Sequence, residues 1–230
     1  MKASVLTLAA LAAGVAMAKP AVVRELIAQP NTAKGFAAVV NRQKLVPEKE
    51  FAEALVAFRV RRNYVFDFAR KDGATVTISI VDEPGKPPMT VSPEAGIGCL
   101  NVAALTNDLK TAESMEKFFV SRARKEFLRT VAFAFGVGSS QFKNNIFTAF
   151  SLHELDFMKE MMPVDVIDKL DRSAKSRGMQ PERIVDYSVA CGEGWAPAPT
   201  NAVQKAIWDE IHALPTAPIK IKPETKKVSN

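Results

Sequence analysis

Hydrophobic residues recur at intervals of three and four between residues 120 and 135, and basic residues occupy the other positions of the first turns. This spacing places the apolar side chains on one face of a helix, and the last turn is apolar on every side. Gly136 and Gly138 follow, and glycine accepts the left-handed backbone with which many helices end. The pattern therefore predicts a central, largely buried helix that stops at Gly136. Its apolar positions are Val120, Ala123, Phe127, Val131 and Phe135.

The residues before this helix alternate between apolar and polar in two short runs, as half-buried strands do. A proline followed by acidic residues precedes them, which is typical of a helix N-terminus. The predicted order is one helix, a set of strands and then the central helix. The elements are a helix from Pro47 through Phe58, strands at 64–68 and 76–80 that form a hairpin or lie side by side, a proline-rich loop at 84–93, and a buried strand at 98–105.

The chain after the central helix is predicted to be mainly helical. Apolar residues recur there at helical spacing, and prolines open two of the segments. The predicted helices span 152–162, 163–177, 181–188 and 201–213.

The first 18 residues have the pattern of a secretory signal. Lys2 precedes an apolar run, and Ala16-Met17-Ala18 matches the small-x-small site of signal peptidase. The run is too short for a permanent transmembrane helix. We therefore expect cleavage after Ala18, a secreted or periplasmic protein, and no transmembrane segment. The remaining divisions that we expect are an irregular arm at 19–46 with a helix at 21–28, a main domain at 47–215, and a flexible basic tail at 216–230.

The formal net charge of the chain is +6. Its basic residues are scattered, and the clusters at 59–62 and 220–227 lack the interleaved aromatic residues that stack on bases. The sequence therefore argues against nucleic acid as a partner. A weak attraction to anionic surfaces stays open.

Cys99 and Cys191 are the two cysteines of the chain. In an oxidising compartment they can form one disulfide, which would constrain the unfolded chain by about 4 to 5 kcal/mol. Cys99 also lies in a strand-like run, where a free thiol behaves as a small hydrophobe. A bridge and two free thiols are therefore both open, and the separation of the two residues excludes a CxxC metal clip.

The residues on both sides of Gly136 align with the sequence motif of a known family, and the alignment needs no gap. In this register the stretch resembles the active-site helix of the archaemetzincins, which are zinc peptidases of the metzincin clan. Their motif is HExxHxxGxxH, followed by four cysteines that form a second zinc site. The matching scaffold residues are Lys125, Glu126, Gly136, Val137, Gly138, Phe150, Ser151, Leu152, Leu155 and Asp156.

The metal ligands of that family are replaced in this chain. The three zinc histidines fall on Arg129, Phe133 and Ser139, and the glutamate that serves as general base falls on Thr130. The whole chain has two histidines, so one chain cannot assemble three imidazoles around an ion. We therefore expect no zinc, no other cofactor and no peptidase activity.

The second zinc site is replaced as well. Its four cysteines fall on Ser140, Asn145, Asp165 and Asp168, all of which carry oxygen. Oxygen ligands suit calcium, but two aspartates one helical turn apart are more often solvated surface residues. We expect solvation here.

Arg129 and Phe133 lie on one helix face at i and i+4. A phenyl ring there fills the volume of an imidazole and an ion, and a guanidinium replaces the positive charge of the ion. An unpaired buried guanidinium is costly. We therefore expect Arg129 to be paired with Glu154 or Asp156, or bonded to backbone carbonyls.

The resemblance implies an α+β fold of the metzincin or zincin type, in which a twisted mixed sheet packs on the central helix and a helical part follows. The function we expect is that of a catalytically inactive pseudoenzyme, which binds a peptide, protein or glycan in the remnant cleft. Two alternatives stay open. One is a hydrolase of another class that uses Glu126, Glu154 or Asp156 as acid or base, and the other is a structural envelope protein.

Overall fold

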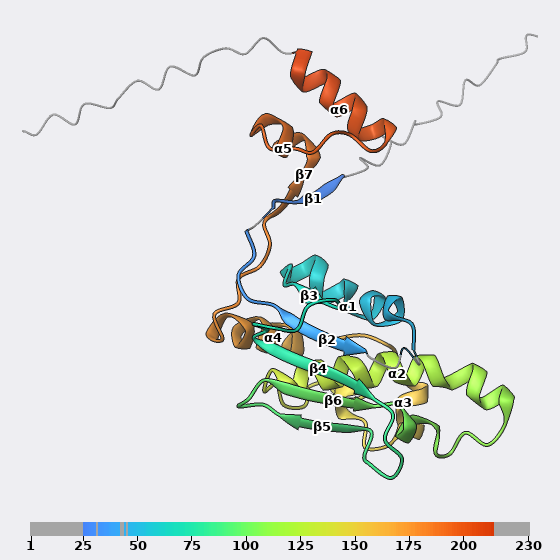
Figure 1. Cartoon of the computed structure of the whole chain (residues 1–230). Coiled ribbons are helices and arrows are strands. Elements are labelled where there is room, and N and C mark those ends of the chain that lie inside the picture. Colours follow the sequence, from blue (N-terminus) through green and yellow to red (C-terminus); the bar gives the residue numbers. More distant parts are fainter. Residues whose placement is uncertain (1–24, 31, 42–43, 45, 214–230) are drawn as a thin grey trace, which may run out of the picture.

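A five-stranded mixed sheet backed by one long helix forms the main part of the protein (Figure 1). The computed structural model describes residues 25–30, 32–41, 44 and 46–213, so the expected signal peptide at 1–18 and the tail at 216–230 lie outside the described residues. The strand order is β3-β2-β4-β6-β5, with β5 antiparallel to its neighbour and the other pairs parallel. The strands are β2 (Ala37–Asn41), β3 (Phe66–Asp67), β4 (Val76–Val81), β5 (Met89–Ser92) and β6 (Ile97–Asn101).

The long helix α2 (Ala112–Ala134) is the predicted central helix. It begins at Thr111, whose hydroxyl accepts a hydrogen bond from the Ser114 N–H at 3.1 Å, and this caps the first turn. It ends at Gly136, which has a φ of 78°, as the sequence predicted. The apolar positions 123, 127 and 131 are fully buried, but Val120 is 37% exposed because the first turns extend beyond the sheet.

The helices cover one face of the sheet. On β4, Val76, Ile78 and Ile80 are buried, whereas the alternate residues of the strand are half-buried on the other face. Helix α1 (Glu48–Arg62) packs beside α2, and its Phe51 ring lies 4.7 Å from that of Phe127. The α+β class, with a mixed sheet packed on the central helix and a helical part after it, is confirmed.

Helix α2 approaches the sheet closely at Gly98 of β6. A Cβ atom added there would lie 2.9 Å from Thr130 Cγ2, 3.0 Å from Ile78 Cδ1 and 3.1 Å from Ala134 Cβ. Real Cβ atoms do not come this close, so only glycine allows this spacing between helix and strand.

Two 3₁₀ turns and two helices follow the sheet. The turns are η1 (Ala103–Thr106) and η2 (Ile146–Thr148), and the helices are α3 (Leu152–Phe157) and α4 (Val164–Ser176). Helix α4 confirms the prediction at 163–177. The helix predicted at 152–162 ends earlier, because the chain becomes extended at Met158 (ψ 146°).

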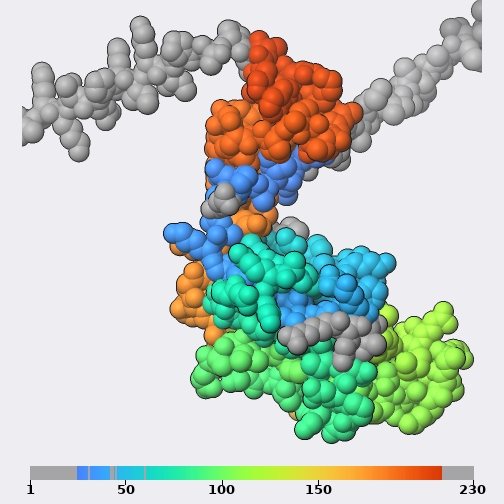
Figure 2. Space-filling model, viewed as in Figure 1, coloured from blue at the N-terminus to red at the C-terminus, as the bar shows by residue number. Residues whose placement is uncertain are grey.

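A smaller lobe stands apart from the sheet and contains β1 (Leu26–Ala28), β7 (Ile184–Asp186), α5 (Tyr187–Gly192) and α6 (Ala202–Ala213). Figures 1 and 2 show this lobe joined to the main part through a narrower region. The predicted helix at 201–213 is confirmed. The helices predicted at 21–28 and 181–188 are wrong where β1 and β7 lie, because these two segments pair with each other as antiparallel strands.

Three predictions about the sheet are also wrong. The segment 19–46 was expected to be an irregular arm, yet it contributes β2, which lies between β3 and β4. The strands near 66 and 76 are therefore neither a hairpin nor neighbours. The loop at 84–93 contains β5, which the prolines at 88 and 93 flank without entering. The domain boundary at residue 47 stays a prediction.

Candidate functional site

Three of the positions that correspond to a zinc site, Arg129, Thr130 and Phe133, lie on the last turns of α2, and Arg129 forms an ion pair. Arg129 Nη1 donates to Glu126 Oε2 at 2.7 Å, and Nη2 donates to the Ala149 carbonyl at 3.1 Å. The guanidinium carbon lies 6.0 Å from the centroid of the Phe133 ring. Arg129 is 15% exposed and Glu126 3% exposed, so the pair is largely removed from water. The predicted bond to a backbone carbonyl is confirmed, but Glu126, not Glu154 or Asp156, is the acidic partner.

Thr130, at the position of the general base, contributes to the packing of α2 against β6. It is fully buried, and its hydroxyl donates to the Glu126 carbonyl at 2.8 Å within the helix. Its methyl group forms part of the close contact with Gly98. Ser139 lies beyond the end of the helix and is exposed.

The residues at these positions do not fit a zinc ion. A guanidinium has no lone pair to offer and carries a positive charge, and a phenyl ring has no donor atom. Both histidines are described, and they lie apart, with His153 on α3 and His212 on α6. Within the described part of the chain, no group of three His, Cys, Asp or Glu side chains is placed to hold a metal. We therefore derive no metal-assisted step for this chain.

Burial perturbs the two charged residues at the centre of α2. Desolvation raises the pKa of Glu126, and the Arg129 charge offsets part of this rise. Desolvation lowers the pKa of Lys125, whose ammonium donates to the Leu155 carbonyl at 2.8 Å. A raised pKa suits an acid catalyst, but the Glu126 carboxyl is enclosed and bound to Arg129. Its surroundings support a structural role.

Arg122, which the sequence did not single out, holds Asp156 in place. It is 1% exposed, donates to both carboxylate oxygens of Asp156 at 2.7 Å, and binds Asp108 at 2.5 and 2.9 Å. These hydrogen bonds raise the pKa of Arg122 and lower that of Asp108. Asp156 is therefore engaged by its ion pair rather than free to act as acid or base.

The residues of the former second zinc site are dispersed. Ser140 Oγ donates to Asp165 Oδ1 at 2.9 Å, and the Gln141 N–H donates to Asp165 Oδ2 at 2.9 Å. Asp168 instead forms an ion pair with Arg62 of α1, and Asn145 caps η2. The expected solvation of both aspartates is wrong for Asp165, which protein donors enclose, and the four residues do not form a shared oxygen cage.

Cys99 and Cys191 are both free in the structure, so the disulfide that the sequence left open is not formed. Cys99 lies on β6 of the main sheet, and Cys191 lies on α5 of the smaller lobe. Burial raises the pKa of the Cys99 thiol. Two thiols on separate parts of the molecule do not act together.

Strand β5 is an edge of the sheet and offers free backbone groups. The Asn101 N–H donates to the Pro88 carbonyl at 2.8 Å, which fixes the alternation of bonds along the ladder. Thr90 and Ser92 then bond to β6, while Met89 and Val91 direct their N–H and C=O groups away from the sheet. Residues 90–92 are exposed, and α2 contacts the strand from beneath.

Asn101 also fixes the loop that leads into β5. This side chain is 2% exposed, accepts from the Glu83 N–H, and donates to the carbonyls of Glu83 and Lys86 at 2.9 and 3.1 Å. These hydrogen bonds hold the backbone of the loop as a neighbouring strand would. Because Asn101 is the last residue of β6, the end of β6 fixes where β5 begins.

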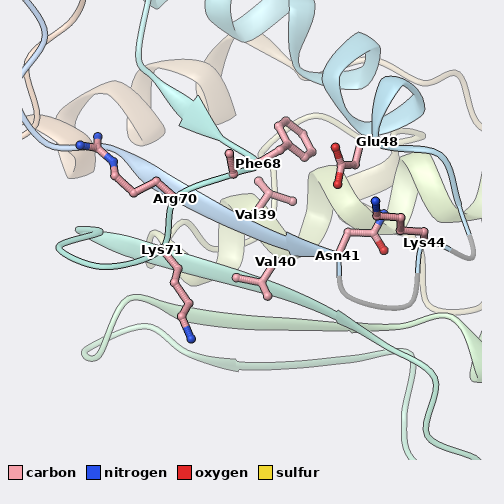
Figure 3. A pocket seen from close by; sticks show the side chains of 9 residues that line it. Val39, Val40, Asn41, Lys44, Glu48, Phe68, Arg70 and Lys71 are labelled. Carbon is pink, nitrogen blue, oxygen red and sulfur yellow. The ribbon is translucent and has the colours of Figure 1, made fainter.

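A cavity of about 300 Å³ lies at the carboxyl end of β2. Beside it, Asp67 Oδ1 accepts from the N–H groups of Ala69 and Arg70, which turns the chain at the end of β3. Figure 3 shows Asn41, Lys44 and Glu48 together at one end of this cavity, while the Arg70 and Lys71 side chains extend away from it. The charged groups do not converge on one ligand position.

The fold and the site together define a mixed α/β protein with a helix-backed sheet, an open edge strand and an ion pair on its central helix. Within the described residues, no helix has the length and apolar character to cross a bilayer.

Two solved structures resemble this chain. Archaemetzincin from Methanopyrus kandleri is 15% identical with a TM-score of 0.46, covering 61% of this chain and 96% of its own. A zinc-dependent peptidase from Methanocorpusculum labreanum is 13% identical with a TM-score of 0.42, covering 59% of this chain and 100% of its own. No protein-family model and no curated protein matches the chain. The first structure belongs to the family that the residues around Gly136 resemble, and the likeness concerns the fold alone.

Proposed function

We propose that this chain is a metzincin-like protein that binds an extended peptide along β5 and does not cleave it. The observation that carries the proposal is the free edge of β5, where Met89 and Val91 present unpaired backbone groups beside α2. An extended peptide adds to such an edge as a further strand, and main-chain hydrogen bonds supply much of its affinity.

The residues on α2 support the absence of cleavage that we propose. Peptide hydrolysis needs an activated water and a base, and the positions that would supply them carry Arg129, which is ion-paired with Glu126, and the buried Thr130. We expect purified protein to contain no stoichiometric zinc by elemental analysis and to leave casein intact. One zinc per chain, lost on substitution of α2 residues, would overturn this part of the proposal.

Peptide binding is tested by removing one donor from the edge. Val91→Pro deletes an N–H that points away from β6, so the sheet keeps its own bonds. Val91→Thr is the matched control, because it changes the side chain and keeps the donor. Peptides selected from a random twelve-residue phage library on the wild type should bind the Thr variant and lose at least about tenfold in affinity for the Pro variant. Equal binding to both variants would contradict the edge as the site.

We also propose that the protein is exported and processed, on the evidence of residues 1–18. Expression in a bacterial host should yield, in the periplasmic fraction, a chain that begins at Lys19 by mass spectrometry. An unprocessed chain confined to the cytoplasm would exclude export.

A further inference from the structure

A hollow of about 520 Å³ lies at the end of β5 where the strand begins. Residues 86–88, which lead directly into Met89, line it, together with residues 107–108 and 151–153. Hollows of this size commonly hold part of a ligand. A peptide that pairs with the edge of β5 therefore reaches this hollow where it passes Met89.

Backbone pairing along the edge stops at Met89. Pro88 has no N–H, and its carbonyl accepts from the Asn101 N–H at 2.8 Å on the side of β6. It therefore directs no backbone group toward an added strand. Beyond Met89 the peptide depends on the side chains that line the hollow, so their chemistry decides which peptide residue is preferred there.

The negative charge of the hollow lies at Asp108. Arg122 donates to both Asp108 and Asp156, so one guanidinium serves two carboxylates. Asp156 is 4% exposed, whereas Asp108 is 53% exposed and lines the hollow. The buried Lys125 ammonium donates to the carbonyls of Leu155 and Asp156 and to neither carboxylate. Asp108 is therefore the acid that a ligand in the hollow can contact.

The positive charge of the hollow lies at Lys86, which also lines it. Among the described residues, no carboxylate lies within ion-pair distance of the Lys86 ammonium. Lys110 Nζ donates to the Asn107 carbonyl at 2.6 Å, and His153 lines the hollow and is neutral in the formal charge count. The hollow therefore presents a carboxylate and an ammonium that are not paired with each other, and a ligand with one cation and one anion complements them.

We propose that the peptide bound along β5 ends in this hollow with a C-terminal lysine or arginine. The basic side chain supplies the cation for Asp108, and the α-carboxylate supplies the anion for Lys86. Antiparallel pairing, which is the more stable kind, places the C-terminus of the peptide beside the beginning of β5. A residue within a peptide offers at most one of these charges. The inference rests on the proposed function and specifies its ligand.

The test uses synthetic twelve-residue peptides of random sequence with free carboxyl ends. Peptides captured by the wild type should be enriched in lysine or arginine at the last position. One captured peptide is then resynthesised with a C-terminal amide, and again with norleucine in place of its last residue. Each change should weaken binding by about threefold to fivefold in fluorescence anisotropy, as expected for the loss of one exposed ion pair.

Variants of the hollow separate the two contacts. Asp108→Asn should remove the preference for a basic residue over norleucine and keep the preference for a carboxylate over an amide, and Lys86→Met should do the reverse. Glu94→Gln is the matched control, because Glu94 is exposed and follows the other end of β5. It should keep both preferences. Thermal melts check that each variant is folded.

The outcomes distinguish this inference from the proposed function. If no peptide is captured, or if Val91→Pro binds as well as the wild type, β5 is not the site and both proposals fail. If peptides bind through β5 but the wild type binds the amide and norleucine forms equally well, this inference alone is overturned. It is also overturned if Glu94→Gln, rather than the variants of the hollow, removes the preferences.

Discussion

Arg129 is the residue at which the chain departs most clearly from a metal site. A histidine there would offer a neutral lone pair to an ion, whereas the guanidinium supplies a permanent charge that must be neutralised from within the protein. Glu126 does this from one turn away on the same helix. The positive charge at this position therefore belongs to the Arg129 side chain, and its presence does not require a bound metal ion.

Removing that charge should destabilise the fold. Arg129→Ala leaves Glu126, 3% exposed, without its partner, and we expect a loss of about 3 kcal/mol in the free energy of unfolding. Adding Glu126→Gln should recover part of the loss, because the stranded group is then neutral. Urea unfolding of the two variants measures both effects. Equal stability of Arg129→Ala and wild type would show that the pair contributes nothing.

The two tyrosines provide a pH-dependent test at the same scale. Burial, followed by the hydrogen bond to Asp171, raises the pKa of Tyr64 to about 12, and burial raises the pKa of Tyr187. The unfolded chain ionises near pH 10. The folded state then holds more protons between these values, so stability is full below about pH 10 and falls as pH rises toward 12.

Absorbance of tyrosinate at 295 nm should therefore stay low in the native protein at pH 10 and rise only at higher pH. In guanidinium chloride, both residues should titrate near 10. Native titration near pH 10 would mean that neither phenol is buried as described.

At the scale of elements, the contact of α2 with β6 sets the distance between helix and sheet. Gly98→Ala places a methyl group within 3.1 Å of three side-chain atoms, and we expect a cost of about 1–3 kcal/mol. Gly138→Ala is the matched control, because no atom lies within 4 Å of its added Cβ. Thr130→Ser removes the nearest of the three atoms and should restore part of the stability of Gly98→Ala. Chemical denaturation that ranks the two alanine variants equally would refute the close approach.

The sequence predicted those elements whose patterns are long. Helices α1, α2, α4 and α6 repeat their apolar spacing over several turns, so local residues suffice. Strand β2 has five residues, and its partners β3 and β4 come more than twenty residues later. Strands β1 and β7 have three residues each and exist through their mutual pairing. Such strands depend on distant partners that local patterns do not contain.

The part of the candidate site that lies within one helix was predicted from the sequence, and the contacts to distant residues were not. The register around Gly136 located Arg129, Thr130 and Phe133 correctly on one helix, because spacing within a helix is regular. The partner of Arg129 was sought on a distant helix, although Glu126 at i−3 was visible in the sequence. Arg122 gave no local signal, since its two acids lie 14 and 34 residues away.

At the scale of the whole molecule, the two lobes should differ in stability. The smaller lobe rests on a two-stranded ribbon of three residue pairs, which is marginal by itself, whereas β4 has paired neighbours on both sides. We expect amides of β1 and β7 to exchange with deuterium at least about tenfold faster than those of β4 and β6. Hydrogen exchange followed by mass spectrometry measures this. Equal protection of both sets would indicate that the lobes open as one unit.

The pairing of β1 with β7 also constrains the order in which the protein is made. Leu26 pairs with Asp186, 160 positions later in the chain (186 minus 26). The ribosome delivers residues from the N-terminus onward, so the first strand has to wait unpaired until most of the chain has emerged. The sheet from β2 to β6, by contrast, is complete in sequence at residue 101. The main part can therefore fold first, and the smaller lobe folds last, when β7 pairs with β1.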